Sequence, residues 1–214
     1  MKTVSLVFEY DLEKQKESGR VWSEEAYRSK DFVFEYSAAS FASFLHHNPQ
    51  RVHIVDTDDV DLLYSKIKKY DVNYSNLDIR DSRDIIKEWK SQDYCFFPLL
   101  EHVKYHASNS KESVVKLDND LTCLKPIDGL DDFSGILSWK FERNVSSGRD
   151  YWGEKYVCQK ALGTDDFKEY NTGVLGISSD NLGIVDEFIE ITEKLISVDA
   201  SSVIRFKSHP NLIS

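Results

Sequence analysis

The sequence predicts an α/β fold, in which a single domain has a central, mostly parallel mixed β-sheet flanked by α-helices. Short apolar and β-branched runs alternate along the chain with stretches of helical periodicity, which is the pattern of parallel strands joined by helices. The run at residues 3–10 ("TVSLVFEY") is nearly continuous, as expected of a central strand that is buried on both faces. A length of 214 residues with 41% hydrophobic side chains suffices for one substantial core.

The other elements of the first half follow from local patterns. Residues 31–47 ("DFVFEYSAASFASFLHH") indicate a short strand that runs into a helix, and residues 49–59 indicate another strand. Asp58 or Asp59 can cap a helix that extends to residue 70. A further short strand is expected at residues 71–79.

The second half begins with two expected helices, at residues 81–90 and 94–108, and Pro98 should lie in the first turn of the second one. Strands are expected at residues 113–117, 133–140 and 170–178. The clearest helix of the chain is residues 180–196. Its apolar face is made by Leu182, Val185, Phe188, Ile189 and Ile196.

Charge and cysteine content limit the partners. The 27 basic and 37 acidic side chains give a net charge of -10, which argues against nucleic acid or an anionic membrane as partner. Cys95, Cys123 and Cys158 form no CxxC or Cys/His cluster, which favours a reducing, cytoplasmic compartment. The amino-terminal apolar run is too short for a secretory signal or a membrane span. Nothing indicates an oligomer, and an alternative is that the chain is one domain of a longer polypeptide.

Two aspartates follow the strand expected at residues 113–117. In an extended segment Asp118 and Asp120 point to the same side, so both carboxylates can reach one ligand, while Asn119 faces away or donates its amide. Their oxygens suit Mg²⁺ or Mn²⁺, and ligands of parallel sheets bind at the carboxyl ends of strands. The same three residues also suit a solvated turn, and spacing alone does not decide between these interpretations.

Two other clusters favour structural roles. Asp56 and Asp58 also follow a strand, but an EF-hand would need glycine where Asp61 stands and glutamate where Ile67 stands. His102 and His106 are four residues apart on an expected helix, but a zinc-protease motif needs a glutamate where Val103 stands. We therefore expect His102 and His106 to be surface or packing residues.

Two segments resemble those of a known enzyme family. Residues 114–127 ("VVKLDNDLTCLKPI") resemble the metal-binding Asp-X-Asp segment of glycosyltransferases with the GT-A fold, and residues 169–181 ("EYNTGVLGISSDN") resemble the strand beside the donor sugar in the same enzymes. The short chain is similar to compact members from bacteria and large DNA viruses. The resemblance implies a single GT-A-like domain over residues 1–214, with a nucleotide-binding half at 1–117 and a metal, donor-sugar and acceptor half at 118–214.

The resemblance also implies roles for individual residues. Asp118, Asp120 and the late His209 would hold Mn²⁺ or Mg²⁺ against the diphosphate of a UDP-sugar. The nucleotide and donor sugar would contact Phe8, Glu9, Tyr10, Asn119, Trp152, Asn171, Thr172 and Gly173. The carboxylates to test as catalytic base are Asp150, Asp165 and Asp166.

The function implied is a metal-dependent glycosyltransferase that acts on a glycan or glycoprotein acceptor. One alternative is a haloacid-dehalogenase-type phosphatase that uses Asp118 and Asp120, although that family normally opens with this motif near its amino terminus. A second alternative is a non-catalytic carbohydrate-binding domain, which the many aromatic residues and the acidic surface would suit.

Overall fold

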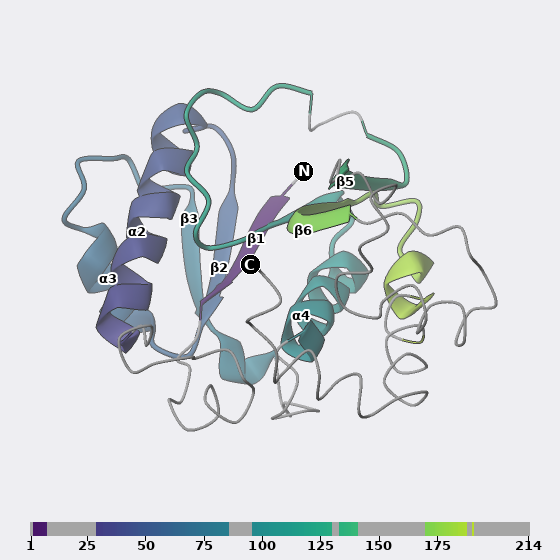
Figure 1. The fold of residues 1–214 in the computed structure, drawn as a ribbon, viewed down its shortest axis with the longest axis horizontal. Coiled ribbons are helices and arrows are strands. Elements are labelled where there is room, and N and C mark those ends of the chain that lie inside the picture. Colours follow the sequence, from purple (N-terminus) through teal and green to yellow (C-terminus); the bar gives the residue numbers. More distant parts are fainter. Residues whose placement is uncertain are drawn as a thin grey trace, which may run out of the picture.

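The computed structural model describes residues 2–7, 29–85, 96–129, 133–140, 170–187 and 190. Within them, one six-stranded sheet has the order β3-β2-β1-β4-β6-β5 (Figure 1). Its strands are β1 (Lys2–Val7), β2 (His53–Thr57), β3 (Leu77–Asp81), β4 (Val114–Leu117), β5 (Ile136–Lys140) and β6 (Tyr170–Ile177). The first four are parallel, and β6 is antiparallel to both β4 and β5. The predicted mostly parallel mixed sheet is thus confirmed.

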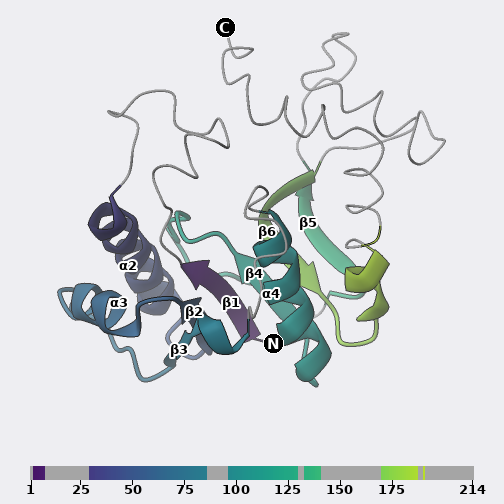
Figure 2. The ribbon, with the colours of Figure 1, turned by 90° about the horizontal axis from the view of Figure 1, so that it is seen from below.

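Helices cover both faces of the sheet. On one face α2 (Lys30–His47) and α3 (Val60–Ile67) pack together over β1 and β2, and α4 (Phe96–Asn109) lies on the other face (Figures 1 and 2). β1 is central and buried on both faces, as its nearly continuous apolar run predicted. Val7 joins the core under α2, whereas Val4 packs with Ile54 and Val114 on the opposite face.

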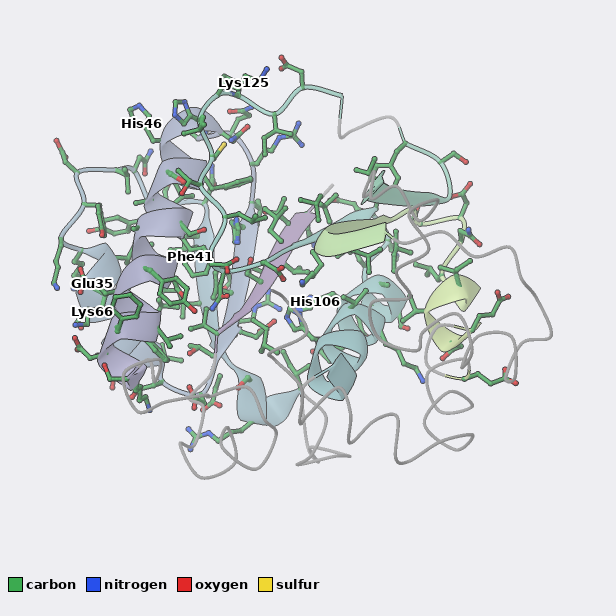
Figure 3. The ribbon with its side chains drawn as sticks, viewed as in Figure 1. Glu35, Phe41, His46, Lys66, His106 and Lys125 are labelled. Carbon is green, nitrogen blue, oxygen red and sulfur yellow. The ribbon has the colours of Figure 1, made fainter. Side chains whose placement is uncertain are left out.

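The prediction of a strand at the start of residues 31–47 is wrong, because the whole stretch belongs to α2. Ser29 caps this helix by accepting a hydrogen bond from the Phe32 backbone N–H at 3.3 Å. The run "DFVFEY" has the alternation of a strand, but Phe34 and Phe41 recur at helical spacing, and both are buried in the core between α2 and the sheet. Figure 3 labels Phe41 on α2. Burial of this face against the sheet outweighs the local β propensity.

Most other predicted elements hold where the structure describes them. The Asp59 carboxylate caps α3 by accepting from the Leu62 N–H at 3.0 Å, and Pro98 lies in the first turn of α4. Residues 82–84 form a 3₁₀ helix (Ser82–Asp84). The helix expected at 81–90 is wrong at Asp81, which belongs to β3, and residues 86–90 are outside the described residues. A last helix begins at residue 183, and Val185 and Leu182 pack against α4 and β6. Among the described residues, no helix combines the length and apolar character needed to cross a membrane.

His53, the first residue of β2, is buried between the sheet and α2. Its ring lies between those of Phe41 and Phe44, with centroid distances of 5.2 and 4.7 Å, and it is 1% exposed. The Ser5 hydroxyl donates to the Leu117 carbonyl at 2.9 Å, so it accepts from His53 Nε2 at 3.1 Å. Burial lowers the pKa of His53 to about 3, so the imidazole is neutral at pH 7.

This burial predicts a loss of stability in acid. Below the unfolded-state pKa of about 6.5, His53 is protonated in the unfolded chain. In the folded chain it stays neutral until the pH falls to about 3. The contribution of the neutral His53 to the free energy of unfolding is therefore complete above pH 6.5. That free energy falls by up to about 1.4 kcal/mol per pH unit as the pH drops toward 3.

Urea unfolding at pH 7, 6 and 5 tests this expectation. The variant His53→Gln keeps an N–H donor without the titrating ring, so its unfolding free energy should fall less steeply than that of the wild type. The exposed His46 provides the control, and His46→Gln should follow the wild type. Parallel curves for His53→Gln and the wild type would contradict the assignment.

Candidate functional site

The two segments that carry the sequence resemblance lie side by side. β4 and β6 pair antiparallel, with Leu117 opposite Val174. One residue beyond this pair, the Asp118 backbone N–H donates to the Gly173 carbonyl at 2.8 Å. Gly173 is buried, and Asn171 and Thr172 precede it on the same strand. The structure therefore places the Asp-Asn-Asp turn directly beside the Asn-Thr-Gly segment.

This turn lies at the carboxyl edge of the parallel strands. Because β1, β2 and β4 are parallel, Asp118 shares an edge of the sheet with Asp58 and Asp59, which follow β2. The side chain of Asp118 is 38% exposed, and Asp120 is exposed. Lys116, whose side chain is almost completely buried, forms an ion pair with Asp118. The edge thus presents two accessible carboxylates next to one buried ammonium group.

A stripe of serines on α2 holds the turn and the loop after it. Ser37, Ser40 and Ser43 recur every three residues, so they lie on one side of the helix. Ser37 accepts from the Asn119 side-chain amide at 3.0 Å, and Ser43 accepts from the Cys123 N–H at 2.9 Å. Ser40 donates to the Leu121 carbonyl. Asn119 therefore anchors the turn to α2, with its side chain directed to the helix.

The end of α2 holds the next part of the loop. Buried Asn48 accepts from the Ile127 N–H at 2.9 Å and donates to the Phe44 carbonyl and to Cys123 Sγ at 3.2 and 3.3 Å. Arg51 donates to the Ile127 carbonyl at 3.1 Å. The loop that follows the two aspartates is thus fixed by side chains rather than by strand pairing.

Many of the predicted contact residues lie outside the described residues. These are Phe8, Glu9, Tyr10, Asp150, Trp152, Asp165, Asp166 and His209. Their assigned roles therefore stay predictions.

Asp118 and Asp120 suit a divalent cation by the chemistry of their donors. Lys116 engages one oxygen of Asp118, which leaves the second oxygen and the exposed carboxylate of Asp120 to coordinate an ion. An all-oxygen set of accessible carboxylates is preferred by Mg²⁺ and Mn²⁺.

A second cluster was not anticipated from the sequence. The Nε2 atoms of His102 and His106, both on α4, lie 2.7 and 2.5 Å from the same oxygen, Oδ2 of Asp56 on β2. All three side chains are buried, so neither histidine is a surface residue. The i, i+4 spacing of the histidines was a sequence signal of this cluster. The expectation that Asp56 follows a strand is wrong, because Asp56 lies within β2 and its side chain is buried.

Burial and hydrogen bonding set the charge states of the cluster. Burial raises the pKa of Asp56, but the hydrogen bonds from His102 and His106 outweigh it and hold that pKa below its usual range. Burial lowers the pKa of His102, and its contact with Asp56 offsets only part of that effect. An ionised carboxylate thus faces a neutral imidazole of His102 at pH 7.

Asn48 offers a test of how the loop is held. We expect Asn48→Ala to lower the unfolding free energy by about 2–3 kcal/mol, because it removes the acceptor of the Ile127 N–H inside the protein. Asn109→Ala is the matched control, since the exposed Asn109 amide donates to the Tyr105 carbonyl of its own helix, its one hydrogen bond within the part of the chain that the structure describes. It should change stability by less than about 1 kcal/mol. Equal urea midpoints for the two variants would argue against the role of Asn48.

Comparison with known proteins supports the fold. No protein-family model and no curated protein sequence matches the chain. A solved structure that matches is that of the galactosyltransferase LgtC in complex with donor and acceptor sugar analogues, with a TM-score of 0.54 and 14% identity, over 96% of this chain and 70% of that one. Another is the bifunctional glycosyltransferase WbbM without ligand, with a TM-score of 0.51 and 10% identity. That match covers 95% of this chain but only 37% of WbbM. The protein therefore has the GT-A fold of glycosyltransferases.

Proposed function

We propose that the protein is a metal-dependent glycosyltransferase, which moves a sugar from a UDP-sugar to a hydroxyl of a glycan or glycoprotein acceptor. The observation that carries this proposal is the hydrogen bond from the Asp118 N–H to the Gly173 carbonyl. It joins two segments about fifty residues apart at the carboxyl edge of the sheet, where α/β folds bind their ligands. The likeness to glycosyltransferase structures does not favour a phosphatase or a non-catalytic binding domain.

Asp118 and Asp120 would hold Mn²⁺ or Mg²⁺ at this edge, with His209 as a further ligand. When bound, the ion would neutralise charge on the diphosphate leaving group. The protein's own contribution is to fix the two carboxylates. Asp118 is held through its backbone by Gly173 and through its side chain by Lys116, while Asn119 is tied to Ser37 on α2. The ammonium group of Lys116, which pairs with Asp118, would also place a positive charge near a bound diphosphate.

Donor recognition would use both sides of this turn. The end of β1 lies between β2 and β4, so Phe8, Glu9 and Tyr10 would follow it toward the nucleotide. On the other side, Gly173 has no side chain, which would allow the donor sugar to approach the backbone between Asn171, Thr172 and Trp152. Residues 1–117 would thus serve the nucleotide, and residues 118–214 the metal, the donor sugar and the acceptor. Asp150, Asp165 and Asp166 are the residues to test as base.

Binding of UDP, GDP and CMP, each with and without Mn²⁺, tests the proposal by isothermal titration calorimetry. We expect UDP to bind only with the metal, and its affinity to fall by more than about tenfold, or about 1.4 kcal/mol, in Asp118→Asn and Asp120→Asn. Asp128→Asn removes an exposed acid from the same loop and should bind UDP like the wild type. Asp120 is exposed, so its substitution separates a binding defect from a folding defect.

Three results would contradict the proposal. Equal binding of the three nucleotides would remove the donor assignment. Metal-independent glycan binding, unchanged in both aspartate variants, would favour a carbohydrate-binding domain. Hydrolysis of a generic phosphate ester that disappears in Asp118→Asn would favour the phosphatase.

A further inference from the structure

Three buried side chains, one from β2 and two from α4, come together on the α4 face of the sheet. Asp56 on β2 faces α4, and both His102 and His106 direct Nε2 to its Oδ2, at 2.7 and 2.5 Å. The potential ligand atoms of the three residues all lie within 4.8 Å of one another. His106 lies on the side of α4 that faces the strands (Figure 3). Asp56 and His102 are fully buried, and His106 is 6% exposed.

Hydrogen bonding within the cluster leaves buried polar atoms without partners. Both imidazoles converge on Oδ2, whereas Oδ1 of Asp56 and Nδ1 of His102 have no hydrogen-bond partner among the described residues. A buried acceptor without a hydrogen-bond partner destabilises the folded state. A buried carboxylate also needs a compensating charge, and two imidazoles supply one only if they are protonated. A cation among the three side chains would supply this charge and could use the second carboxylate oxygen.

The donor set indicates which cation. Two imidazole nitrogens and one carboxylate oxygen suit Zn²⁺, whereas Mg²⁺ and Ca²⁺ prefer oxygen alone. Four-coordinate Zn²⁺ has ligand distances of about 2.0–2.1 Å, which places neighbouring donor atoms about 3.3 Å apart. The observed 2.5 and 2.7 Å would therefore have to widen by less than about 1 Å, which small side-chain rotations can provide.

We propose that Asp56, His102 and His106 bind one Zn²⁺ ion, which fastens α4 to β2. This site is separate from the aspartates of the turn. Asp56 shares its face of the sheet with Leu6 on β1 and Lys116 on β4. The positive charge of Lys116 also acts electrostatically on His102. The ion is structural, because all three ligands belong to elements of the core, and its binding does not depend on glycosyltransferase activity.

Zinc titration of the untagged, chelator-treated full chain tests the proposal. We expect one equivalent of Zn²⁺ to bind both the wild type and the double variant Asp118→Asn/Asp120→Asn, with a rise in Tm of several degrees. His106→Gln should weaken binding by more than tenfold and abolish that rise in Tm. His46→Gln, which changes an exposed histidine on α2, should leave both unchanged.

A measurement on the wild type avoids dependence on variants that fail to fold. Co²⁺ in place of Zn²⁺ should give the intense visible absorption of a four-coordinate ion with nitrogen ligands. A wild type that binds no Zn²⁺ or lacks this absorption overturns the proposal. So does binding that is lost in the Asp118→Asn/Asp120→Asn variant and retained in His106→Gln. Absence of zinc binding at the histidines would not contradict the glycosyltransferase proposal. Failure of UDP binding would likewise not contradict the zinc site.

Discussion

The backbone hydrogen bond between Asp118 and Gly173 depends on the pairing of β4 with β6, and the candidate site depends on that bond. A slip of one residue in this pairing would turn Asp118 to the opposite face of the sheet. The register is fixed by burial on both faces: Val115 and Leu117 pack with Phe44 on the α2 side, and Val114 packs on the α4 side. The apolar contacts that form the core therefore also determine the direction of the Asp118 carboxylate. Function and stability are hard to separate at this strand.

The turn itself has a different kind of support. Residues 119–127 form no strand or helix, so their backbone groups need other partners. Ser40, Ser43 and Asn48 supply partners for backbone groups, and small hydroxyl side chains allow the loop to lie close against the helix. A stripe of larger apolar residues would have buried these backbone groups without partners. The polarity of one side of α2 is thus explained by the loop that it holds.

The sequence predicted the architecture well, because apolar runs and helical periodicity are local signals. The exception was residues 31–47, where β-branched and aromatic residues produced a strand-like alternation at the start of a buried helix. The cluster of Asp56 with His102 and His106 was not predicted for another reason. Its members are 46 and 50 residues apart, and their meeting depends on which face of α4 docks on which strand. Neither is encoded in a local pattern. The pairing of Asp118 with Gly173 was accessible only through the resemblance of two motifs.

The charges on the α4 face show how an acidic protein could accept the anionic donor that we propose. Leu6 on β1 pairs with Asp56 on β2, and the β1–β4 register, continued by two residues, places Leu6 opposite Asp118. Asp56 and Asp118 therefore lie at the same level along the strands, about 10 Å apart across β1. Lys116 is buried beside them and already neutralises one carboxylate. A divalent ion at the zinc site would exceed the single negative charge of Asp56. At the turn, it would balance the two negative charges of Asp118 and Asp120. The net charge of -10 would then be carried by the outer surface, while the edge beside Asp118 became locally positive. A diphosphate could bind there because the field at a site is set by its nearest charges and bound ions rather than by the sum over the chain.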